Sequence, residues 1–304
     1  MVYTITLNPA LDYSIQMTEF NLGKLNLSEK AYFLGGGKGI NVSKVLKNLG
    51  VESIALGFLG GFTGEFIRKE LNEKSIKEEF VEVEGNTRVN LKIKNGDVET
   101  EVAGISPKIT EDHLKKLLNN LSKLEDGDIL VLSGSVPKGV SSNVYAEIMN
   151  SLKKDVKVII DTRGEAFEEA LSSKPYLVKP NHHELEEFCK KELPNLKDII
   201  EGARIIQSKG AQNVIVSLGK DGSLLITKEG DVFKGNIPKG VLKNSVGAGD
   251  SMVAGIVSKL ASGDDLVDAY KIGISSGSAT AYSYDLCTKE EVMSLLNQIE
   301  ISKV

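Results

Sequence analysis

Short apolar runs alternate with longer amphipathic stretches along most of the chain, and this pattern predicts the fold class. The runs are rich in Val, Ile and Leu, and we expect strands at 2–7, 52–60, 128–133, 156–161, 176–181 and 213–217. Elsewhere apolar residues recur every three or four positions, which predicts helices at about 42–49, 63–74, 110–123, 141–152, 196–209, 250–262, 265–283 and 289–297. Strands that alternate with helices indicate βαβ units. The sequence therefore predicts an α/β fold with a mostly parallel sheet covered on both faces.

Two segments depart from this pattern. In 86–102, apolar residues alternate with polar ones, and Asn95-Gly96 is a strong signal for a hairpin turn. Residues 13–33 contain only short alternating pieces with polar spacers, and we expect them to be irregular. Together these segments predict a small β appendage inserted into the main domain. A further hairpin, at 224–227 and 231–234, is expected at a sheet edge.

Most predicted strands end in small or polar residues at their C-terminal side. These residues are Asn8 and Asp12, Ser133 to Ser135, Asp161, Lys179 and Asn181, and Ser217 and Gly219. In open α/β sheets, ligands bind outside the carboxyl ends of the strands. Because several strands end in this way, the sequence predicts a composite ligand cleft along that edge of the sheet.

Two predicted helices begin among glycines, which is typical of an anion-binding helix N-terminus. Gly247-Ala-Gly249 precedes Asp250, and Gly36-Gly-Lys-Gly39 opens an earlier helix. Glycine tolerates unusual backbone angles, and unpaired N–H groups at a helix start attract negative charge. The local sequence leaves two interpretations of Asp250 open. It is either an N-cap, or a base held beside developing negative charge.

Composition and charge restrict the class of protein. The 304 residues are 41% hydrophobic and 26% charged, as in an ordinary globular chain. A net charge of −5 without a basic stripe argues against nucleic-acid binding. Cys189 and Cys287 lie far apart, no signal peptide precedes the first strand, and no apolar run approaches about 18 residues. We therefore expect a soluble cytoplasmic protein with no membrane contact.

The common nucleotide-binding fingerprints are missing from the sequence. No G-x-x-x-x-G-K-[ST] motif occurs, which excludes a P-loop. Gly247-Ala-Gly249 lacks the third glycine of G-x-G-x-x-G, because Met252 stands there, and no strand leads directly into it. A nicotinamide-binding Rossmann site is therefore not expected.

Seven short motifs follow one another along the chain. They are Thr6-Leu-Asn-Pro-Ala-Leu-Asp12, Gly36-Gly-Lys-Gly-Ile-Asn41, Thr87-Arg88, Ser133-Gly-Ser135, Lys179-Pro-Asn181 with Glu184, Ser217-Leu-Gly-Lys-Asp-Gly222 and Asn244-Ser-Val-Gly-Ala-Gly-Asp250. In this order they resemble the PfkB (ribokinase-like) carbohydrate kinase family, and within it the 1-phosphofructokinase and tagatose-6-phosphate kinase branch. The resemblance covers essentially the whole chain. It implies a ribokinase-like three-layer α/β/α fold with a mostly parallel sheet and a small inserted β-sheet lid.

The resemblance also implies domain boundaries and a partner. Residues 1–10, 35–85 and 105–304 would form the main α/β domain that binds nucleotide and sugar. Residues 11–34 and 86–104 would form the lid, which covers the sugar in the family. In this branch the lid pairs with the lid of a second subunit, so a homodimer is implied.

Each residue that matches a family motif acquires an implied role. Asp250 would be the general base, and the backbone N–H groups of Gly247, Ala248 and Gly249 would hold the transferring phosphoryl group. The sugar-phosphate ligands would be Asp12, Gly37, Lys38, Asn41, Arg88 and Ser135. The ATP ligands would be Asn181, Ser217, Leu218, Gly219, Lys220, Asp221, Gly222 and again Gly249. Glu184, with Asn181 in an Asn-x-x-Glu motif, would help place Mg²⁺ through water.

The substrate that the resemblance implies is a phosphosugar. An Arg88 guanidinium aimed into the cleft would suit bidentate recognition of phosphate, although a surface arginine on a strand also fits the residue alone. Asp12-Tyr13 and 57–64 look most like 1-phosphofructokinases, which convert fructose 1-phosphate and ATP to fructose 1,6-bisphosphate and ADP. Tagatose-6-phosphate kinase and then 6-phosphofructokinase are the alternatives. A non-catalytic sugar-phosphate sensor would be expected to lack Asp250 or the glycines before it.

Overall fold

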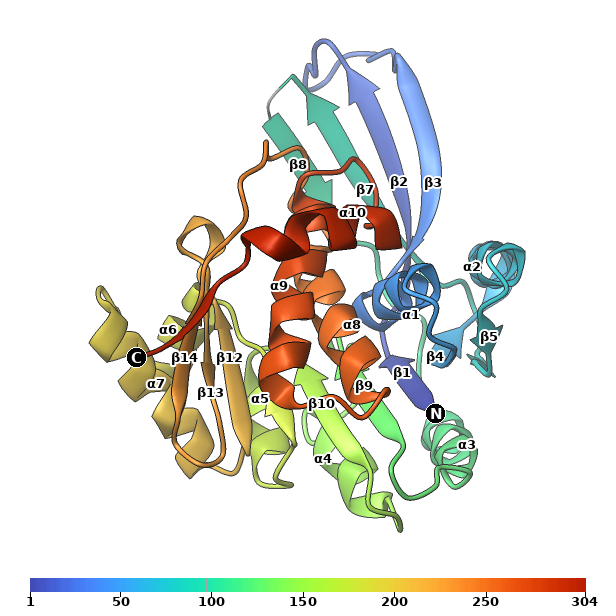
Figure 1. Ribbon diagram of the computed structural model, residues 1–304. Helices are drawn as coiled ribbons and strands as arrows, with labels where there is room; N and C mark the ends of the chain where they lie inside the picture. Colours follow the sequence, from blue (N-terminus) through green and yellow to red (C-terminus); the bar gives the residue numbers. More distant parts are fainter. Residues whose placement is uncertain (97) are drawn as a thin grey trace.

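The computed structural model describes residues 1–96 and 98–304, and it divides the strands between two sheets (Figure 1). The strands are β1 (Val2–Thr6), β2 (Ala10–Met17), β3 (Lys30–Gly36), β4 (Ser53–Leu59), β5 (Lys77–Glu78), β6 (Val81–Glu82), β7 (Arg88–Asn95), β8 (Val98–Val102), β9 (Ile129–Ser133), β10 (Lys157–Asp161), β11 (Leu177–Val178), β12 (Asn213–Ser217), β13 (Ser223–Ile226), β14 (Val232–Gly235) and β15 (Ile301–Lys303). The helices are α1 (Lys38–Asn48), α2 (Gly61–Glu73), α3 (Glu111–Leu121), α4 (Val144–Ser151), α5 (Glu165–Leu171), α6 (His182–Cys189), α7 (Leu196–Ser208), α8 (Ala248–Leu260), α9 (Leu266–Ala281) and α10 (Lys289–Leu295), with short 3₁₀ helices η1 (Gly219–Asp221) and η2 (Leu296–Gln298).

The larger sheet has the order β15-β14-β13-β12-β11-β10-β9-β1-β4-β5, and β6 pairs with the end of β4. Seven neighbouring strands of this sheet run parallel, namely β12, β11, β10, β9, β1, β4 and β5. At one edge, β13, β14 and β15 pair in the antiparallel sense. β1 lies between β4 and β9, so the chain leaves it on one side and later returns on the other. Such a switch in strand order opens a crevice at the carboxyl ends of the central strands.

Alternating side chains of the central strands fill two separate cores. In β9, Leu130 and Leu132 pack with the helices α3 to α7 on one face of the sheet. Ile129 and Val131 point to the other face, where α1, α8, α9 and α10 cover them (Figure 1). A strand with both faces covered needs apolar residues at every position, which explains the uninterrupted apolar runs in the sequence. The predicted three-layer α/β/α fold is confirmed.

The smaller sheet has the order β3-β2-β7-β8 and stands apart at one end of the molecule (Figure 1). β7 and β8 form the hairpin expected in 86–102; residue 97 lies outside the described part. The expectation that 13–33 is irregular was wrong, because β2 and β3 occupy both ends of that segment. β2 pairs in parallel with β7, and β3 pairs antiparallel with β2. Residues 30–34 are exposed, so their sequence shows no buried face.

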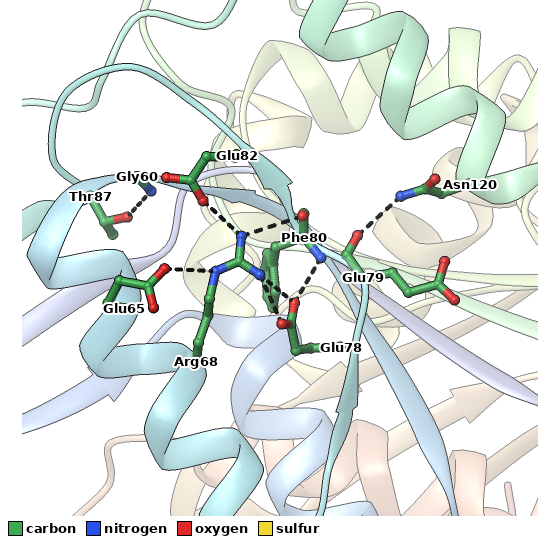
Figure 2. A network of polar contacts seen from close by, with 9 residues as sticks. All are labelled: Gly60, Glu65, Arg68, Glu78, Glu79, Phe80, Glu82, Thr87 and Asn120. Carbon is green, nitrogen blue, oxygen red and sulfur yellow. Dashed lines mark hydrogen bonds and ion pairs between the residues drawn. The ribbon is translucent and has the colours of Figure 1, made fainter.

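A cluster of charged side chains fastens the edge strands β5 and β6 to α2 (Figure 2). Arg68 on α2 donates from Nη1 to both carboxylate oxygens of Glu78, at 2.8 and 2.9 Å, and from Nη2 to Glu82 at 2.9 Å. Nearby, the Gly60 N–H donates to the Thr87 hydroxyl at 3.0 Å. Since Thr87 directly precedes β7, this bond ties the smaller sheet to the start of α2.

Three short strands, β5, β6 and β15, were not predicted from the sequence. Each contains only two or three residues and lies at or near a sheet edge, so no periodic pattern can develop. In the described part of the chain, none of the helices combines the length and apolar character that crossing a bilayer requires.

Candidate active site

Asp250 lies in the first turn of α8, which begins at Ala248 rather than at the predicted residue 250. The N-cap is Gly247, whose φ of 80° is strained for any residue with a side chain. A Cβ at Gly249 would stand 3.2 Å from Nζ of Lys179, so the absence of a side chain leaves room beside this ammonium group. The helix therefore presents backbone N–H groups and a carboxylate from the same turn.

The Asp250 carboxylate is buried and has a neutral hydrogen-bond donor. It is 6% exposed, and Asn41 Nδ2 on α1 donates to its Oδ2 at 2.8 Å. Burial, together with the nearby Asp161 carboxylate, raises the pKa of Asp250 to about 6, whereas Asn41, Lys38 and Lys179 oppose the rise. A carboxyl with such a pKa is ionised near neutral pH but can still accept a proton, which suits a general base.

Two lysines and one aspartate form a charge cluster next to Asp250, in which Asp161 and Lys179 are buried and Lys38 is half-buried. Lys38 Nζ lies 2.9 Å from one oxygen of Asp161, and Lys179 Nζ lies 3.5 Å from the other. Burial would raise the pKa of Asp161, but the two ammonium groups outweigh it and lower that pKa. Burial likewise opposes the charge on Lys38, yet Asp161 raises the pKa of Lys38 above its ordinary value. Lys38 is therefore cationic at the cleft.

Asp12 lies on β2, at the wall of a cavity of about 180 Å³ that Asn41 and Gly247 also line. Its carboxylate accepts from Asn90 Nδ2 at 2.9 Å and pairs with Lys92 Nζ at 3.0 Å. Both partners stand on β7, so the parallel pairing of β2 with β7 holds Asp12 in place. A cavity with fixed carboxylate and amide groups is suited to the hydroxyls of a sugar.

Arg88 and Ser135 come together around Asn8 rather than at that cavity. Arg88 Nη2 donates to the Asn8 carbonyl at 3.1 Å, and Nε donates to the Pro9 carbonyl at 3.4 Å. The Asn8 side chain donates to Ser135 Oγ at 3.1 Å and accepts from Ser106 Oγ at 2.7 Å. Burial lowers the pKa of Arg88, because little charge compensates the guanidinium in this position.

Gly37 allows the turn between β3 and α1 that carries Lys38 and Asn41. Its φ is 134°, and a Cβ there would come within 2.5 Å of Thr6 Cγ2. A larger residue at this position would force the start of α1 away from β1.

The residues expected to bind ATP lie at the carboxyl ends of β11 and β12. Asn181 pairs with Ser217 in a parallel bridge, and the chain then turns through η1. The Leu218 N–H donates to the Gly222 carbonyl at 2.9 Å, which closes this turn. Ser217, Leu218, Gly219, Lys220, Asp221 and Gly222 thus form one loop, separated from Asp161 by the width of β11.

Asn181 and Glu184 form a capping box at the start of α6. The Asn181 side chain accepts from the Glu184 N–H, and Glu184 Oε2 accepts from the Asn181 N–H, both at 2.9 Å. A hydrogen-bonded cap explains the Asn-x-x-Glu spacing by itself. The pair could have been recognised as a cap from the sequence.

The donor set is consistent with a magnesium ion that is bound mainly through ATP. In residues 1–96 and 98–304, no three His, Cys, Asp or Glu side chains come together as a metal cage. Mg²⁺ that arrives with nucleotide needs only one or two protein carboxylates and keeps several waters. Glu184 fits this role, because its carboxylate has acceptor positions beyond the one used in the cap.

The roles assigned from the sequence omitted Asp161, Lys179, Asn90 and Lys92. Asp161 is the last residue of β10 and Lys179 directly follows β11, so their positions at strand ends were the available signal. Asn90 and Lys92 are polar residues of the alternating segment 86–102. Their partner Asp12 lies about 80 residues away in sequence, and periodicity carries no information about such a contact.

The fold and this site define a class of protein. A buried carboxylate at a helix N-terminus, flanked by cationic lysines, can accept a proton next to a polyanion. These are the requirements of phosphoryl transfer to a hydroxyl group.

Comparison with known proteins identifies the family within this class. The model of the pfkB family carbohydrate kinases matches residues 6–292, and the chain belongs to this family. It is 43% identical over 305 residues to a 1-phosphofructokinase of Bacillus subtilis, covering 100% of both chains. It is 36% identical over 265 residues to a tagatose-6-phosphate kinase of Staphylococcus epidermidis, covering 86% of this chain and 85% of the relative.

Solved structures agree with this assignment. The structure of phosphofructokinase-2 from Escherichia coli in complex with substrates and products is 31% identical and superposes with a TM-score of 0.91. The comparison covers 97% of this chain and 98% of the other. The ribokinase-like fold and the assignment as a carbohydrate kinase are thus confirmed.

Proposed function

We propose that the protein is a 1-phosphofructokinase, which transfers a phosphoryl group from ATP to fructose 1-phosphate. The observation that carries the catalytic part of the proposal is the placement of Asp250. This carboxylate is buried, has a pKa of about 6, and shares the first turn of α8 with backbone N–H groups that begin the helix. The higher identity to a relative named 1-phosphofructokinase supports the choice of sugar.

In this proposal Asp250 accepts the proton of the attacking sugar hydroxyl. The backbone N–H groups of Gly247, Ala248 and Gly249 stabilise the negative charge on the transferring group. Asn41 orients the Asp250 carboxylate through its 2.8 Å hydrogen bond. Lys38 and Lys179 add positive charge, and Asp161 holds both ammonium groups in position.

The nucleotide and the sugar occupy different parts of the cleft. ATP lies along Asn181 and the loop from Ser217 to Gly222. Glu184 would hold Mg²⁺ through water, and the bound ion would supply positive charge to the phosphates. The sugar lies against Asp12, Gly37, Lys38 and Asn41. Arg88 and Ser135, held together around Asn8, receive the phosphate that the sugar already carries.

The smaller sheet acts as a lid in this proposal, formed by residues 11–34 and 86–104 on a main domain of 1–10, 35–85 and 105–304. Two observations support a homodimer through the lid. Apolar side chains are exposed along it, with Leu25 at 89% and Leu22 at 85%. On its outer strands, Phe33 is 46% exposed although it stacks on Tyr13 at 4.3 Å between ring centroids.

The alternatives to this proposal are two other sugar substrates and a non-catalytic role. Tagatose 6-phosphate and fructose 6-phosphate differ from fructose 1-phosphate in the hydroxyl that must face Asp250. A sugar-phosphate sensor would not need a base with a raised pKa beside helix amides, and Asp250 has both properties.

A coupled assay of ADP release tests the proposal. The kcat/KM values for fructose 1-phosphate, fructose 6-phosphate and tagatose 6-phosphate are compared at saturating ATP and Mg²⁺. We expect the value for fructose 1-phosphate to exceed the others by about tenfold or more, which corresponds to roughly 1.4 kcal/mol of discrimination in the transition state. A preference for either 6-phosphate contradicts the choice of sugar, and the absence of turnover with all of them contradicts the kinase proposal.

A further inference from the structure

A buried ion pair that the mechanism does not use lies beside the sugar cavity. Lys44 on α1 is only 7% exposed, and its Nζ contacts Oε1 of Glu70 on α2. Both side chains line the cavity that also contains Asp12 and Asn41. Burying a lysine costs free energy of folding unless its charge is paired and its N–H groups donate hydrogen bonds. The partners of Lys44 therefore indicate what the ion pair does.

Lys44 and Glu70 share a third partner, the backbone of Gly35. The Gly35 N–H donates to Glu70 Oε2 at 2.7 Å, and the Gly35 carbonyl accepts from Lys44 Nζ at 2.7 Å. The three contacts form a closed ring that joins β3, α1 and α2. We call this ring the Gly35 clamp.

The position of Gly35 in the smaller sheet explains why its backbone is available. β3 is the edge strand of that sheet, with β2 as its neighbour, so alternate N–H and C=O groups of β3 point away from the sheet. At Gly35 the two charged side chains of the clamp take the place of a further strand. A Cβ on Gly35 would stand 2.8 Å from Glu70 Oε2, so a side chain at this position would displace the Glu70 carboxylate.

The Gly35 clamp lies where the smaller sheet passes into α1, the helix that carries Lys38 and Asn41. Lys38, the first residue of α1, follows Gly35 by only three positions. Gly36 lies next to Asp12, because a Cβ on Gly36 would stand 3.0 Å from Asp12 Oδ2. Lys44 also lies one helical turn beyond Asn41 on α1, on the same side of the helix. A shift of β3 at Gly35 would therefore move the groups that surround the cavity.

We propose that Lys44 and Glu70 are positioning residues, which hold β3 at Gly35, directly after the lid segment 11–34, and thereby fix the position of the lid over the sugar cavity. This inference rests on the proposed sugar site. It predicts that the ion pair controls the affinity for the sugar substrate and leaves the ATP loop at the far end of the cleft unaffected.

The test uses Lys44→Met/Glu70→Met, because removing both charges leaves no unpaired ion in the interior. The loss of two charged hydrogen bonds to Gly35 should raise the KM for the sugar phosphate by about tenfold or more, with the KM for ATP within about twofold of wild type. Hydrogen exchange of the peptide that covers β3 should also accelerate. The conservative single substitution Lys44→Arg keeps a cation beside Glu70 and should retain most of the wild-type affinity for the sugar phosphate.

Controls separate this role from a general effect on stability. Lys47→Met removes a half-exposed lysine of the same helix, which pairs with Glu52 at 3.2 Å, and should change neither KM nor exchange. Glu70→Gln keeps an acceptor for the Gly35 N–H and provides a milder variant if the double variant does not fold; it should give a smaller rise in KM. If variants lose thermal stability while sugar KM and β3 exchange stay at wild-type values, the clamp is only structural and the proposal is wrong.

The same experiment distinguishes failure of the inference from failure of the proposed function. If wild-type protein phosphorylates none of the three sugar phosphates, the proposed function fails, yet exchange at β3 still reports on the clamp. If wild type is active but the double variant exchanges β3 as slowly as wild type does, the inference fails alone.

Discussion

The Asp250 carboxylate sits where opposing electrostatic effects meet. Its burial and the neighbouring Asp161 favour the protonated form, whereas Asn41, Lys38 and Lys179 favour the ionised form. The result is a pKa of about 6, high for an aspartate but still below neutral pH. Catalysis through this group therefore requires a pH above that value.

The pH dependence of kcat should reveal this balance. We expect kcat to fall as the pH drops through about 6, because Asp250 becomes protonated and can no longer accept the hydroxyl proton. Asn41→Leu removes the hydrogen bond that favours the carboxylate, so the acidic limb should move to higher pH. Profiles of kcat against pH for both proteins measure the shift.

A distant amide serves as the control for that profile. Asn120 on α3 donates to the Glu79 carbonyl (Figure 2), and Asn120→Leu should leave the acidic limb in place. A limb that stays unchanged in Asn41→Leu, or that moves to lower pH, would show that Asn41 does not act on the base.

At the scale of secondary structure elements, helix N-termini provide most of the predicted chemistry. α8 offers its first-turn amides next to Gly247, and α6 begins at the Asn181 cap that also bridges to Ser217. Glu184 is part of the cap, and we propose that it also serves as a carboxylate near the metal. These roles can be separated because only the second needs a negative charge.

Two substitutions of Glu184 should differ in a defined way. Glu184→Gln retains an oxygen that can accept from the Asn181 N–H, so stability should stay near wild type while the Mg²⁺ concentration for half-maximal activity rises. Glu184→Ala should in addition lose about 0.5–2 kcal/mol of unfolding free energy. Urea unfolding and Mg²⁺ titrations measure these effects. An unchanged Mg²⁺ requirement in both variants would limit Glu184 to the cap.

Strands with buried residues could be predicted from the sequence, whereas strands with exposed residues could not. β9 and β10 were apparent because their residues are apolar on both faces of the sheet. β3 was missed because residues 30–34 are exposed and its pairing depends on β2 and not on its own pattern. Strands at such edges have little sequence signature of their own.

Some residues of the candidate site could also be predicted from local sequence, whereas the contacts between them could not. Glycines before α1 and α8 marked Lys38 and Asp250 in the sequence, since helix starts among glycines have a local physical meaning. The contacts that tune these residues join positions more than 100 residues apart, as between Lys38 and Asp161. No local pattern encodes such contacts, so the charge cluster became visible only in the fold.

At the scale of the whole molecule, the smaller sheet extends away from the larger sheet and its helices (Figure 1). Apolar side chains of this region, such as Leu22 and Leu25, are exposed. A second copy of the sheet would cover these side chains, and we expect the protein to be a dimer. Leu25→Asp should weaken the dimer, because it places a charge among apolar groups, and Ile205→Asp on α7 is the matched control. Light scattering at micromolar concentration gives the mass. A monomeric wild type would contradict the lid interface.

In the proposed reaction, Asp250 removes a proton from the sugar while the amides of α8 hold the phosphoryl group. The most direct measurement is kcat of Asp250→Asn with fructose 1-phosphate, together with the Kd for ATP. We expect kcat to fall by about 10²–10⁴-fold, the usual contribution of a general base, with ATP binding nearly unchanged. A variant that keeps kcat near the wild-type value would contradict the assignment of Asp250 as the base.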